Sequence, residues 1–300
     1  MSSMNRRSMF SMAVISCASM IAWAQVDSLR PRIEQVVALA DGRIGVAVQP
    51  LETMDTLAIH GDARFPMQSV YKFPLALAVL SRVDQGTLSL RQRLHLTKNE
   101  LRPNTWSPLR ERYPNGTDSL TLDDVLRYTV SESDNNGCDI LFRLLGGTSV
   151  VDHFIHRLGI RDISIVATEE EMAMDRQVQY RNWSSPAAMA HLLSMFYRGN
   201  ILSRDSRDHL LKLMTTPNTS PVRLQGILPK EAIVAHKTGS SGADSTGLAA
   251  ATNDVGIMTL PHARHVIVVV FVSDSRAAAN TRDQYIARIG KIVWDVFAGE

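Results

Sequence analysis

Segments with the composition of β-strands lie near both ends of this chain and enclose a long helical middle. Short β-branched segments are expected at residues 43–48 and 54–59, and four more between residues 233 and 272. Between residues 66 and 215 the spacing of apolar residues favours helices. Strands at both ends predict one sheet built from the two terminal parts, with the helical block inserted into it.

The terminal parts of the chain that would form the sheet also predict two helices and a turn. Apolar residues recur at helical spacing over residues 26–40 and 281–297, so one amphipathic helix opens this part of the chain and another closes it. Asn253 and Asp254 interrupt the β-branched segments near the C-terminus. Because both are common turn residues, we expect a hairpin turn there.

Composition excludes several classes of protein. The 300 residues are 45% hydrophobic and 21% charged, as in an ordinary globular protein. The 32 Lys and Arg nearly balance the 30 Asp and Glu, so no basic surface for nucleic acid is expected.

We expect two lobes, an α/β lobe of residues 25–65 and 216–300 and an all-α lobe of residues 66–215, with a ligand site in the cleft between them.

The N-terminus has the features of an export signal. Two arginines precede an apolar stretch at residues 9–21, and a small-x-small sequence ends at Ala24. Residues 1–24 are therefore a predicted signal peptide, and the mature protein would be periplasmic or secreted. A lipid-modified Cys17 is the alternative. Removal of the peptide leaves Cys138 as the single cysteine, so no internal disulfide is expected.

Ser69 and Lys72 lie one turn apart at the start of a predicted helix. On one helix face an amine can contact a hydroxyl, and a lysine that has lost its proton can activate a serine as a nucleophile. A helix N-cap followed by a solvated lysine is the alternative for this pair.

Two other polar tripeptides follow in the chain. Ser133-Asp134-Asn135 falls between predicted helices, and Lys237-Thr238-Gly239 follows a predicted strand. Alone, each has an ordinary structural explanation: a helix cap for the first and a polar turn for the second. The order S-x-x-K, S-D-N, K-T-G is the signature of class A β-lactamases and penicillin-binding proteins.

With these three motifs the chain resembles the class A serine β-lactamases, in their extended-spectrum branch, over essentially its whole mature length. The resemblance implies an α+β fold of the β-lactamase/transpeptidase type. In that fold an antiparallel five-stranded sheet is flanked by the terminal helices and carries an inserted all-α domain. No metal and no cofactor is implied.

The resemblance also implies a glutamate that activates the water for deacylation. Residues 167–172 and Asn182-Trp183 resemble the omega loop of this family. Three consecutive glutamates leave the register open: Glu169 is the favoured residue, and Glu170 is its competitor.

The implied mechanism is acyl transfer to Ser69 and then to water, with Lys72 or Glu169 as the base for acylation. The backbone N–H groups of Ser69 and Ser240 would form the oxyanion hole. Ser133 would pass a proton to the departing nitrogen. The expected substrate-binding residues are Trp106, Asn135, Arg223, Lys237, Thr238, Gly239 and Ser240. For Arg223 a surface position is the alternative, and for Trp106 a core position.

Some residues depart from the common family pattern or stand outside it. In the resemblance, Ala173 and Asp139 each stand where many relatives have asparagine. Ala173 implies that the deacylating water is positioned differently or that the register of the glutamates is wrong. Asp139 implies a differently folded loop and a wider active site. His236 is interpreted as a strand-end residue rather than a metal ligand. Cys138 is interpreted as a small buried hydrophobic residue rather than a nucleophile.

The sequence thus predicts an exported enzyme that hydrolyses the β-lactam amide bond of penicillins and cephalosporins and confers antibiotic resistance. Its partners would be small-molecule β-lactams, and the protein is expected to be a monomer without nucleic-acid or metal partners. The alternatives are a cell-wall D,D-peptidase and a β-lactam sensor that acylates without hydrolysis.

Overall fold

The computed structural model describes residues 26–53, 55–216 and 222–299. The predicted signal peptide, the cleavage position after Ala24 and the alternative lipid site at Cys17 lie outside the described residues.

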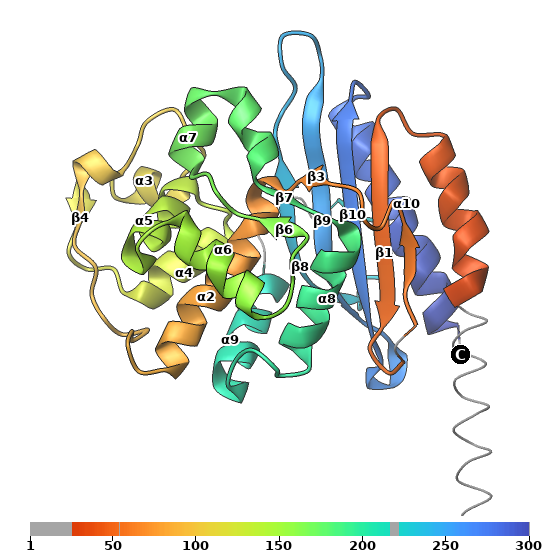
Figure 1. Cartoon of the computed structure of the whole chain (residues 1–300), viewed down its shortest axis with the longest axis horizontal. Coiled ribbons are helices and arrows are strands. Elements are labelled where there is room, and N and C mark those ends of the chain that lie inside the picture. Colours follow the sequence, from red (N-terminus) through yellow and green to blue (C-terminus); the bar gives the residue numbers. More distant parts are fainter. Residues whose placement is uncertain (1–25, 54, 217–221, 300) are drawn as a thin grey trace, which may run out of the picture.

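A five-stranded antiparallel sheet forms the centre of the molecule (Figure 1). In spatial order its strands are β2 (Leu57–Ile59), β1 (Arg43–Pro50), β10 (His265–Ser275), β9 (Ala249–Thr259) and β8 (Ile233–Ser240). The first two strands in this order come from the start of the chain and the other three from its end. The predicted α+β fold with a sheet built from both terminal parts is therefore confirmed.

The predicted turn at Asn253 and Asp254 is wrong. Both residues lie inside β9, where Asn253 is opposite Gly239 and Asp254 is opposite Thr238 on β8. Both are fully buried, and both have hydrogen-bond partners, which is what allows polar side chains inside a sheet. The connection between β8 and β9 lies further upstream, after Ser240.

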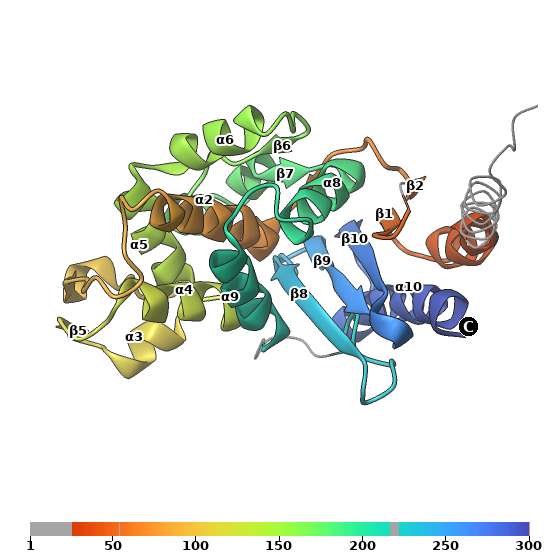
Figure 2. The ribbon, with the colours of Figure 1, turned by 90° about the horizontal axis from the view of Figure 1, so that it is seen from below.

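Both faces of the sheet are covered, which explains the continuous apolar sequence of β10. Successive side chains of a strand point to opposite faces. Val268 and Val270 pack with the terminal helices, which span residues 26–38 and α10 (Ala279–Ala298). Phe271 instead packs with the helical block. Figure 2 shows the two terminal helices on one side of the sheet and the other helices on the opposite side.

The helical block is built around α2 (Lys72–Asp84), whose first nine residues are all buried. Its other α-helices are α3 (Pro108–Arg112), α4 (Leu122–Ser131), α5 (Asn135–Leu145), α6 (Thr148–Arg157), α7 (Glu169–Met174), α8 (Pro186–Tyr197) and α9 (Arg204–Thr215).

Short strands and 3-10 helices complete the fold. The short strands are β3 (Phe65–Pro66), β4 (Leu96–Thr97), β5 (Gly116–Thr117), β6 (Ile163–Ser164) and β7 (Trp183–Ser184), and the 3-10 helices are η1 (Gln68–Tyr71), η2 (Lys98–Glu100), η3 (Arg176–Arg181) and η4 (Pro261–Ala263). Strand β7 pairs with both β3 and β6, which joins the segment that precedes η1 to the segment that precedes α7.

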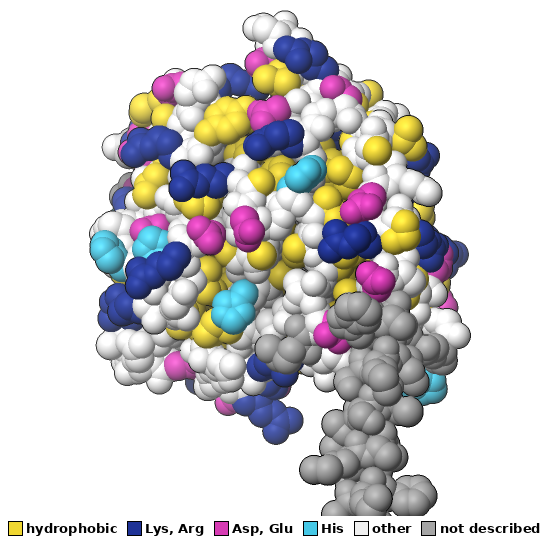
Figure 3. All heavy atoms as spheres, turned by 45° about the vertical axis from the view of Figure 1, so that its right-hand side comes forward, with side chains coloured by type: hydrophobic (Ala, Val, Ile, Leu, Met, Phe, Trp, Pro, Cys, Tyr) yellow, Lys and Arg dark blue, Asp and Glu magenta, His cyan; other side chains and the backbone are white. Residues whose placement is uncertain are grey.

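Within the described ranges, no helix combines the length and the apolar character that a membrane span requires. On the face shown in Figure 3, basic and acidic side chains are interspersed with apolar ones.

The contact between the sheet and the helical block predicts the effect of a truncation. Phe271 is fully buried and stacks on Phe65, with 5.9 Å between the ring centroids. The substitution Phe271→Ala should lower the free energy of unfolding by about 3 to 5 kcal/mol, because it leaves a cavity between sheet and helices. Urea unfolding measures this loss. Leu39→Ala is the control, since Leu39 is 77% exposed and its truncation should have little effect. Equal effects of the two substitutions would contradict this packing.

Candidate active site

Ser69 and Lys72 lie together at the junction of η1 and α2. The 3-10 turn carries Ser69, and Lys72 is the first residue of α2. The Lys72 Nζ donates a hydrogen bond of 3.0 Å to the Ser69 Oγ. Lys72 is fully buried, so the alternative of a solvated lysine is wrong.

The Lys72 ammonium has three further oxygen partners. It donates to the Ser133 carbonyl oxygen at 2.8 Å and to the Asn135 Oδ1 at 2.6 Å, and it forms an ion pair of 3.0 Å with the Glu169 Oε1. A charge removed from water needs such partners. One buried ammonium therefore connects three separate segments of the chain.

A second buried lysine lies on the other side of Ser133. The Lys237 Nζ donates to the Ser133 Oγ at 2.9 Å and to the Thr238 carbonyl oxygen at 3.0 Å. Burial and, next, the positive charge of Lys72 lower the pKa of Lys237 to about 7. Ser133 is thus held between two lysines, in a left-handed backbone conformation with φ of 57°.

The side chain of Asp134 holds this strained turn in position. It accepts hydrogen bonds from the Gly137 N–H at 2.8 Å, as the N-cap of α5, and from the Leu109 N–H at 2.7 Å. The Ser107 hydroxyl donates to the same carboxylate. Because its contacts come from both α3 and α5, Asp134 fixes the residues on either side of it, Ser133 and Asn135.

Trp106 lies beside this turn at the surface. Its Nε1 donates to the Glu132 carbonyl oxygen at 2.9 Å, and the residue is 57% exposed. The alternative of a core tryptophan is therefore wrong. A cavity of about 310 Å³ is lined by Ser69, Trp106, Ser133, Asn135, Thr238, Gly239 and Ser240.

Gly239 allows β8 to approach the Ser69 turn closely. A Cβ atom at this position would lie 2.5 Å from the Met67 carbonyl oxygen and 3.1 Å from the Ser69 nitrogen. Any larger residue must therefore move the strand or the turn. The next residue, Ser240, lines the same cavity as Ser69.

Arg223 is buried behind Ser240. Only 4% of it is exposed, so the surface alternative is wrong. Its guanidinium donates to the Ser240 Oγ at 2.6 Å, to the Gly239 carbonyl oxygen at 3.1 Å and to Asp283 Oδ1 at 2.7 Å. The arginine therefore adds positive charge at the Ser240 end of the cavity.

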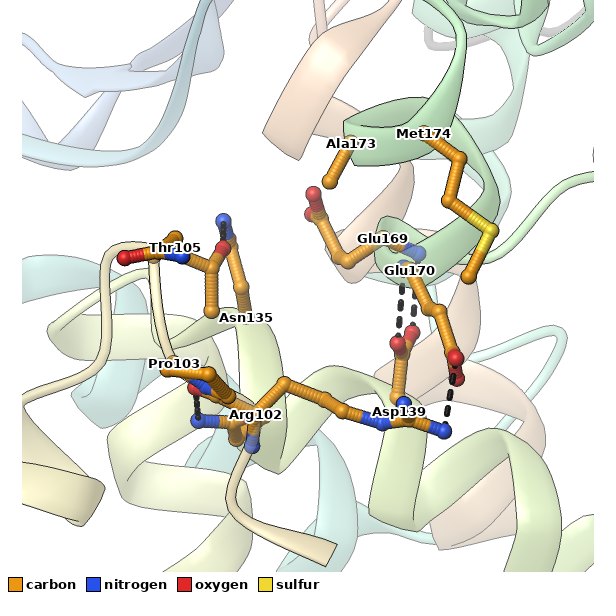
Figure 4. A pocket seen from close by; sticks show the side chains of 11 residues that line it. Arg102, Pro103, Thr105, Asn135, Asp139, Glu169, Glu170, Ala173 and Met174 are labelled. Carbon is orange, nitrogen blue, oxygen red and sulfur yellow. Dashed lines mark hydrogen bonds and ion pairs between the residues drawn. The ribbon is translucent and has the colours of Figure 1, made fainter.

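The two candidate glutamates differ in where their carboxylates lie (Figure 4). Glu169 is 9% exposed and reaches Lys72. Glu170 points away and forms an ion pair of 2.6 Å with the partly exposed Arg102. Both residues line a second cavity of about 260 Å³, which Ala173 also lines. The geometry therefore favours Glu169 over Glu170.

Asp139 attaches the start of α7 to α5. Its two carboxylate oxygens accept hydrogen bonds of 2.9 Å from the backbone N–H groups of Glu169 and Glu170. Burial and then the negative charge of Glu169 raise the pKa of Asp139 to about 6. A single oxygen, as in asparagine, could accept only one of these two N–H groups in the same way.

Three polar residues that the sequence interpretation left out support the site. Asn253 donates from Nδ2 to the carbonyl oxygens of Pro66 at 2.8 Å and Met67 at 3.0 Å, just before the Ser69 turn. Asp283 on α10 binds Arg223, and Asp254, which follows Asn253 on β9, accepts from the Leu224 N–H. For Asn253 and Asp254 the signal in the sequence is a polar pair inside a β-branched segment, for which turn preference alone predicts a hairpin.

The remaining two residues singled out from the sequence are both buried. His236 is not a strand-end residue as predicted, since it is the fourth of eight residues in β8. Cys138 is fully buried in the apolar core, as predicted, and its Sγ donates to the Tyr71 hydroxyl. Among the described residues, no group of three or more His, Cys, Asp or Glu side chains is arranged to hold a metal ion.

A serine hydroxyl that accepts a hydrogen bond from a buried lysine, which is in turn paired with a buried carboxylate, is the arrangement typical of a serine acyl-transfer enzyme. Residues 28–297 match the model of the β-lactamase enzyme family. The chain is 48% identical over 276 residues to β-lactamase VEB-1 of Pseudomonas aeruginosa, covering 91% of this chain and 92% of that one. It is 40% identical over 281 residues to extended-spectrum β-lactamase PER-1 of the same species, covering 94% and 91%.

Solved structures agree with this relationship. A β-lactamase from Chitinophaga pinensis DSM 2588 is 54% identical with a TM-score of 0.87, covering 89% of this chain and 98% of that one. The TLA-1 extended-spectrum β-lactamase is 49% identical with a TM-score of 0.88, covering 90% and 98%. The chain belongs to the β-lactamase enzyme family. It is a class A serine β-lactamase, which hydrolyses β-lactams and thereby gives antibiotic resistance.

The attachment of the glutamate loop predicts the effect of losing Asn182. This fully buried amide accepts from the N–H groups of Val166 and Ala167 at 2.9 Å and donates to the Ala167 carbonyl oxygen at 2.8 Å. Asn182→Ala leaves these groups without partners and should lower the free energy of unfolding by about 1 to 3 kcal/mol. It should also lower kcat, because Glu169 follows this segment.

Urea unfolding and steady-state kinetics measure both effects. Asn99→Ala is the matched control, because Asn99 is exposed. A stable Asn182→Ala protein with unchanged kcat would show that the amide does not hold the loop.

Proposed function

We propose that Ser69 is the nucleophile of this β-lactamase. Its Oγ attacks the lactam carbonyl carbon while its proton passes to a base. Lys72, at 3.0 Å, and Glu169, through a water molecule, are both candidates for that base. The observation that carries the proposal is the buried Lys72, which contacts both Ser69 and Glu169.

The oxyanion formed in this step would be bound by the backbone N–H groups of Ser69 and Ser240. Such donors act on charge that appears only in the tetrahedral states, and removing one typically costs about 10² to 10³ in rate. The close approach allowed by Gly239 supports this assignment, because it brings the β8 backbone next to the Ser69 nitrogen.

Ser133 is the proposed proton carrier to the departing lactam nitrogen. Its hydroxyl gives a proton to the nitrogen as the C–N bond breaks, and the hydroxyl then regains a proton from the neighbouring lysines. Its Oγ accepts from Lys237 at 2.9 Å, and a nearby positive charge favours the ionised form of the hydroxyl in transit.

The substrate carboxylate is the proposed ligand of Lys237, Thr238 and Ser240. Charge-assisted hydrogen bonds to an ammonium and to hydroxyls suit a carboxylate, and the buried Arg223 adds charge behind Ser240. Asn135 would bind the amide of the acyl side chain, and Trp106 would form a wall of the cleft.

Glu169 is the proposed base for deacylation. It takes a proton from water, whose oxygen attacks the acyl carbon. The bond to the Ser69 Oγ then breaks, and this oxygen receives the proton back from Glu169 through Lys72, which restores the free hydroxyl and the carboxylate. Ala173 has no polar side chain to help hold that water, so the carboxylate and backbone would position it.

Intact-mass spectrometry with excess benzylpenicillin tests these assignments. The wild type should consume substrate without a lasting adduct, whereas Glu169→Gln should accumulate the acyl-enzyme because deacylation loses its base. Glu170→Gln is the matched control and should turn over like the wild type.

The other outcomes identify the alternatives. A trapped adduct in Glu170→Gln but not in Glu169→Gln would reverse the two glutamates. A persistent adduct on the wild type would point to a D,D-peptidase or a sensor.

Oxyimino-cephalosporins are proposed as substrates alongside penicillins. The relatives PER-1 and TLA-1 are named extended-spectrum β-lactamases. In this chain, the cavity of about 260 Å³ lined by Asn135 and Ala173 offers room for a large acyl side chain. Purified enzyme should therefore hydrolyse both classes at measurable kcat/KM. Hydrolysis of benzylpenicillin without hydrolysis of oxyimino-cephalosporins would contradict this spectrum.

We further propose that residues 1–24 direct export to the periplasm or medium. The mature enzyme is proposed to be a monomer. Its two proposed lobes are residues 25–65 with 216–300, and residues 66–215. Protein recovered from the periplasm should begin near Gln25, and its molar mass from light scattering should be that of a single chain. A membrane-bound form lipidated at Cys17, or a dimer, would contradict these proposals.

A further inference from the structure

A buried carboxylate–imidazole pair lies behind the active-site strand and has no part in the chemistry proposed above. The His236 Nδ1 lies 2.9 Å from both carboxylate oxygens of Asp254, and both side chains are fully buried. Gly256 is opposite His236 on β9, and a Cβ there would lie 2.7 Å from the His236 Cβ. Because a Cβ there would also lie 2.5 Å from the Ala235 carbonyl oxygen, glycine permits the close approach of β9 to β8 at His236.

This pair joins three segments that meet at the carboxylate-binding end of the cavity. Asp254 is on β9, His236 is on β8, and the Asp254 Oδ2 also accepts from the backbone N–H of Leu224 at 3.1 Å. Leu224 directly follows Arg223, whose guanidinium holds the Ser240 Oγ. A shift of Asp254 would therefore move the arginine that supports Ser240.

The Asp254–His236 pair also bears on the charge of Lys237. His236 directly precedes Lys237, so their side chains lie on opposite faces of β8. Burial and the charge of Lys72 lower the pKa of Lys237, and Arg223 acts in the same direction. Asp254 opposes them more strongly than Glu169 does. These four groups, on α2, the segment before β8, β9 and α7, are the charges that act on Lys237.

We propose that Asp254 and His236 are positioning residues for recognition of the substrate carboxylate. Asp254 fixes the Arg223 segment through the Leu224 N–H, and its negative charge favours the protonated form of the Lys237 ammonium. His236 holds the Asp254 carboxylate in place. The inference rests on the proposed binding of the carboxylate by Lys237, Thr238 and Ser240, and it extends that site to two residues behind the sheet.

The substitution Asp254→Asn keeps the shape of the side chain and removes its charge. With benzylpenicillin, KM should rise severalfold while kcat changes much less, because a less protonated Lys237 binds the substrate carboxylate more weakly. Removal of the negative charge lowers the pKa of Lys237 further. The alkaline limb of kcat/KM should therefore move to lower pH.

The methyl ester of benzylpenicillin separates this role from a merely structural one. The wild type should prefer the free acid, and Asp254→Asn should lose most of that preference, because the ester offers no carboxylate. Thr252→Val is the matched control. Thr252 is on β9 like Asp254, and its hydroxyl accepts a buried hydrogen bond of 2.8 Å from the Arg282 Nε. The substitution removes this bond and should lower Tm without changing the acid-to-ester ratio or the pH profile.

A second pair of variants applies if Asp254→Asn does not fold. His236→Asn retains a donor near the position of Nδ1 and should keep the acid-to-ester preference, whereas His236→Leu should lose it. Equal losses on acid and ester with an unchanged pH profile, or no difference between the two His236 variants, would overturn the inference. If the wild type itself shows no preference for the acid, the proposed carboxylate site fails and the inference fails with it.

Discussion

The ammonium of Lys72 is the interaction on which the site depends. Fully buried, it must be surrounded by oxygen atoms, and its partners come from η1, from the Ser133–Asn135 turn and from α7. The positions of Ser69 and Glu169 are therefore linked through one atom. Lys72 is also the first of nine consecutive buried residues of α2, so the packing of this helix fixes the position of its ammonium.

The second constraint is the covered sheet. Because apolar layers pack on both faces, the buried Asn253 and Asp254 side chains of β9 need hydrogen-bond partners. Asn253 holds the backbone before Ser69, and Asp254 holds the segment of Arg223. Gly239 then permits the strand to touch the Ser69 turn. The cavity is thus shaped by the sheet as much as by the helices.

Much of this arrangement could be predicted from the sequence, for identifiable reasons. The three motifs and the split of the strands between both ends of the chain are local patterns, and they led to the fold and to the cluster of Ser69, Lys72, Ser133 and Lys237. The turn expected at Asn253 and Asp254 failed because residue preference cannot reveal that distant backbone groups supply partners for a buried amide and carboxylate. The choice between Glu169 and Glu170 needed the contacts of their carboxylates, with the buried Lys72 for Glu169 and with Arg102 for Glu170.

Rapid-quench mass spectrometry of Lys72→Ala with benzylpenicillin tests the central role of Lys72 most directly, because it follows formation of the acyl-enzyme in a single turnover. We expect acylation to slow by at least about 10²-fold, since Ser69 loses its hydrogen-bond partner and Glu169 its buried ion pair. Acylation at the wild-type rate by a folded Lys72→Ala protein would contradict the account.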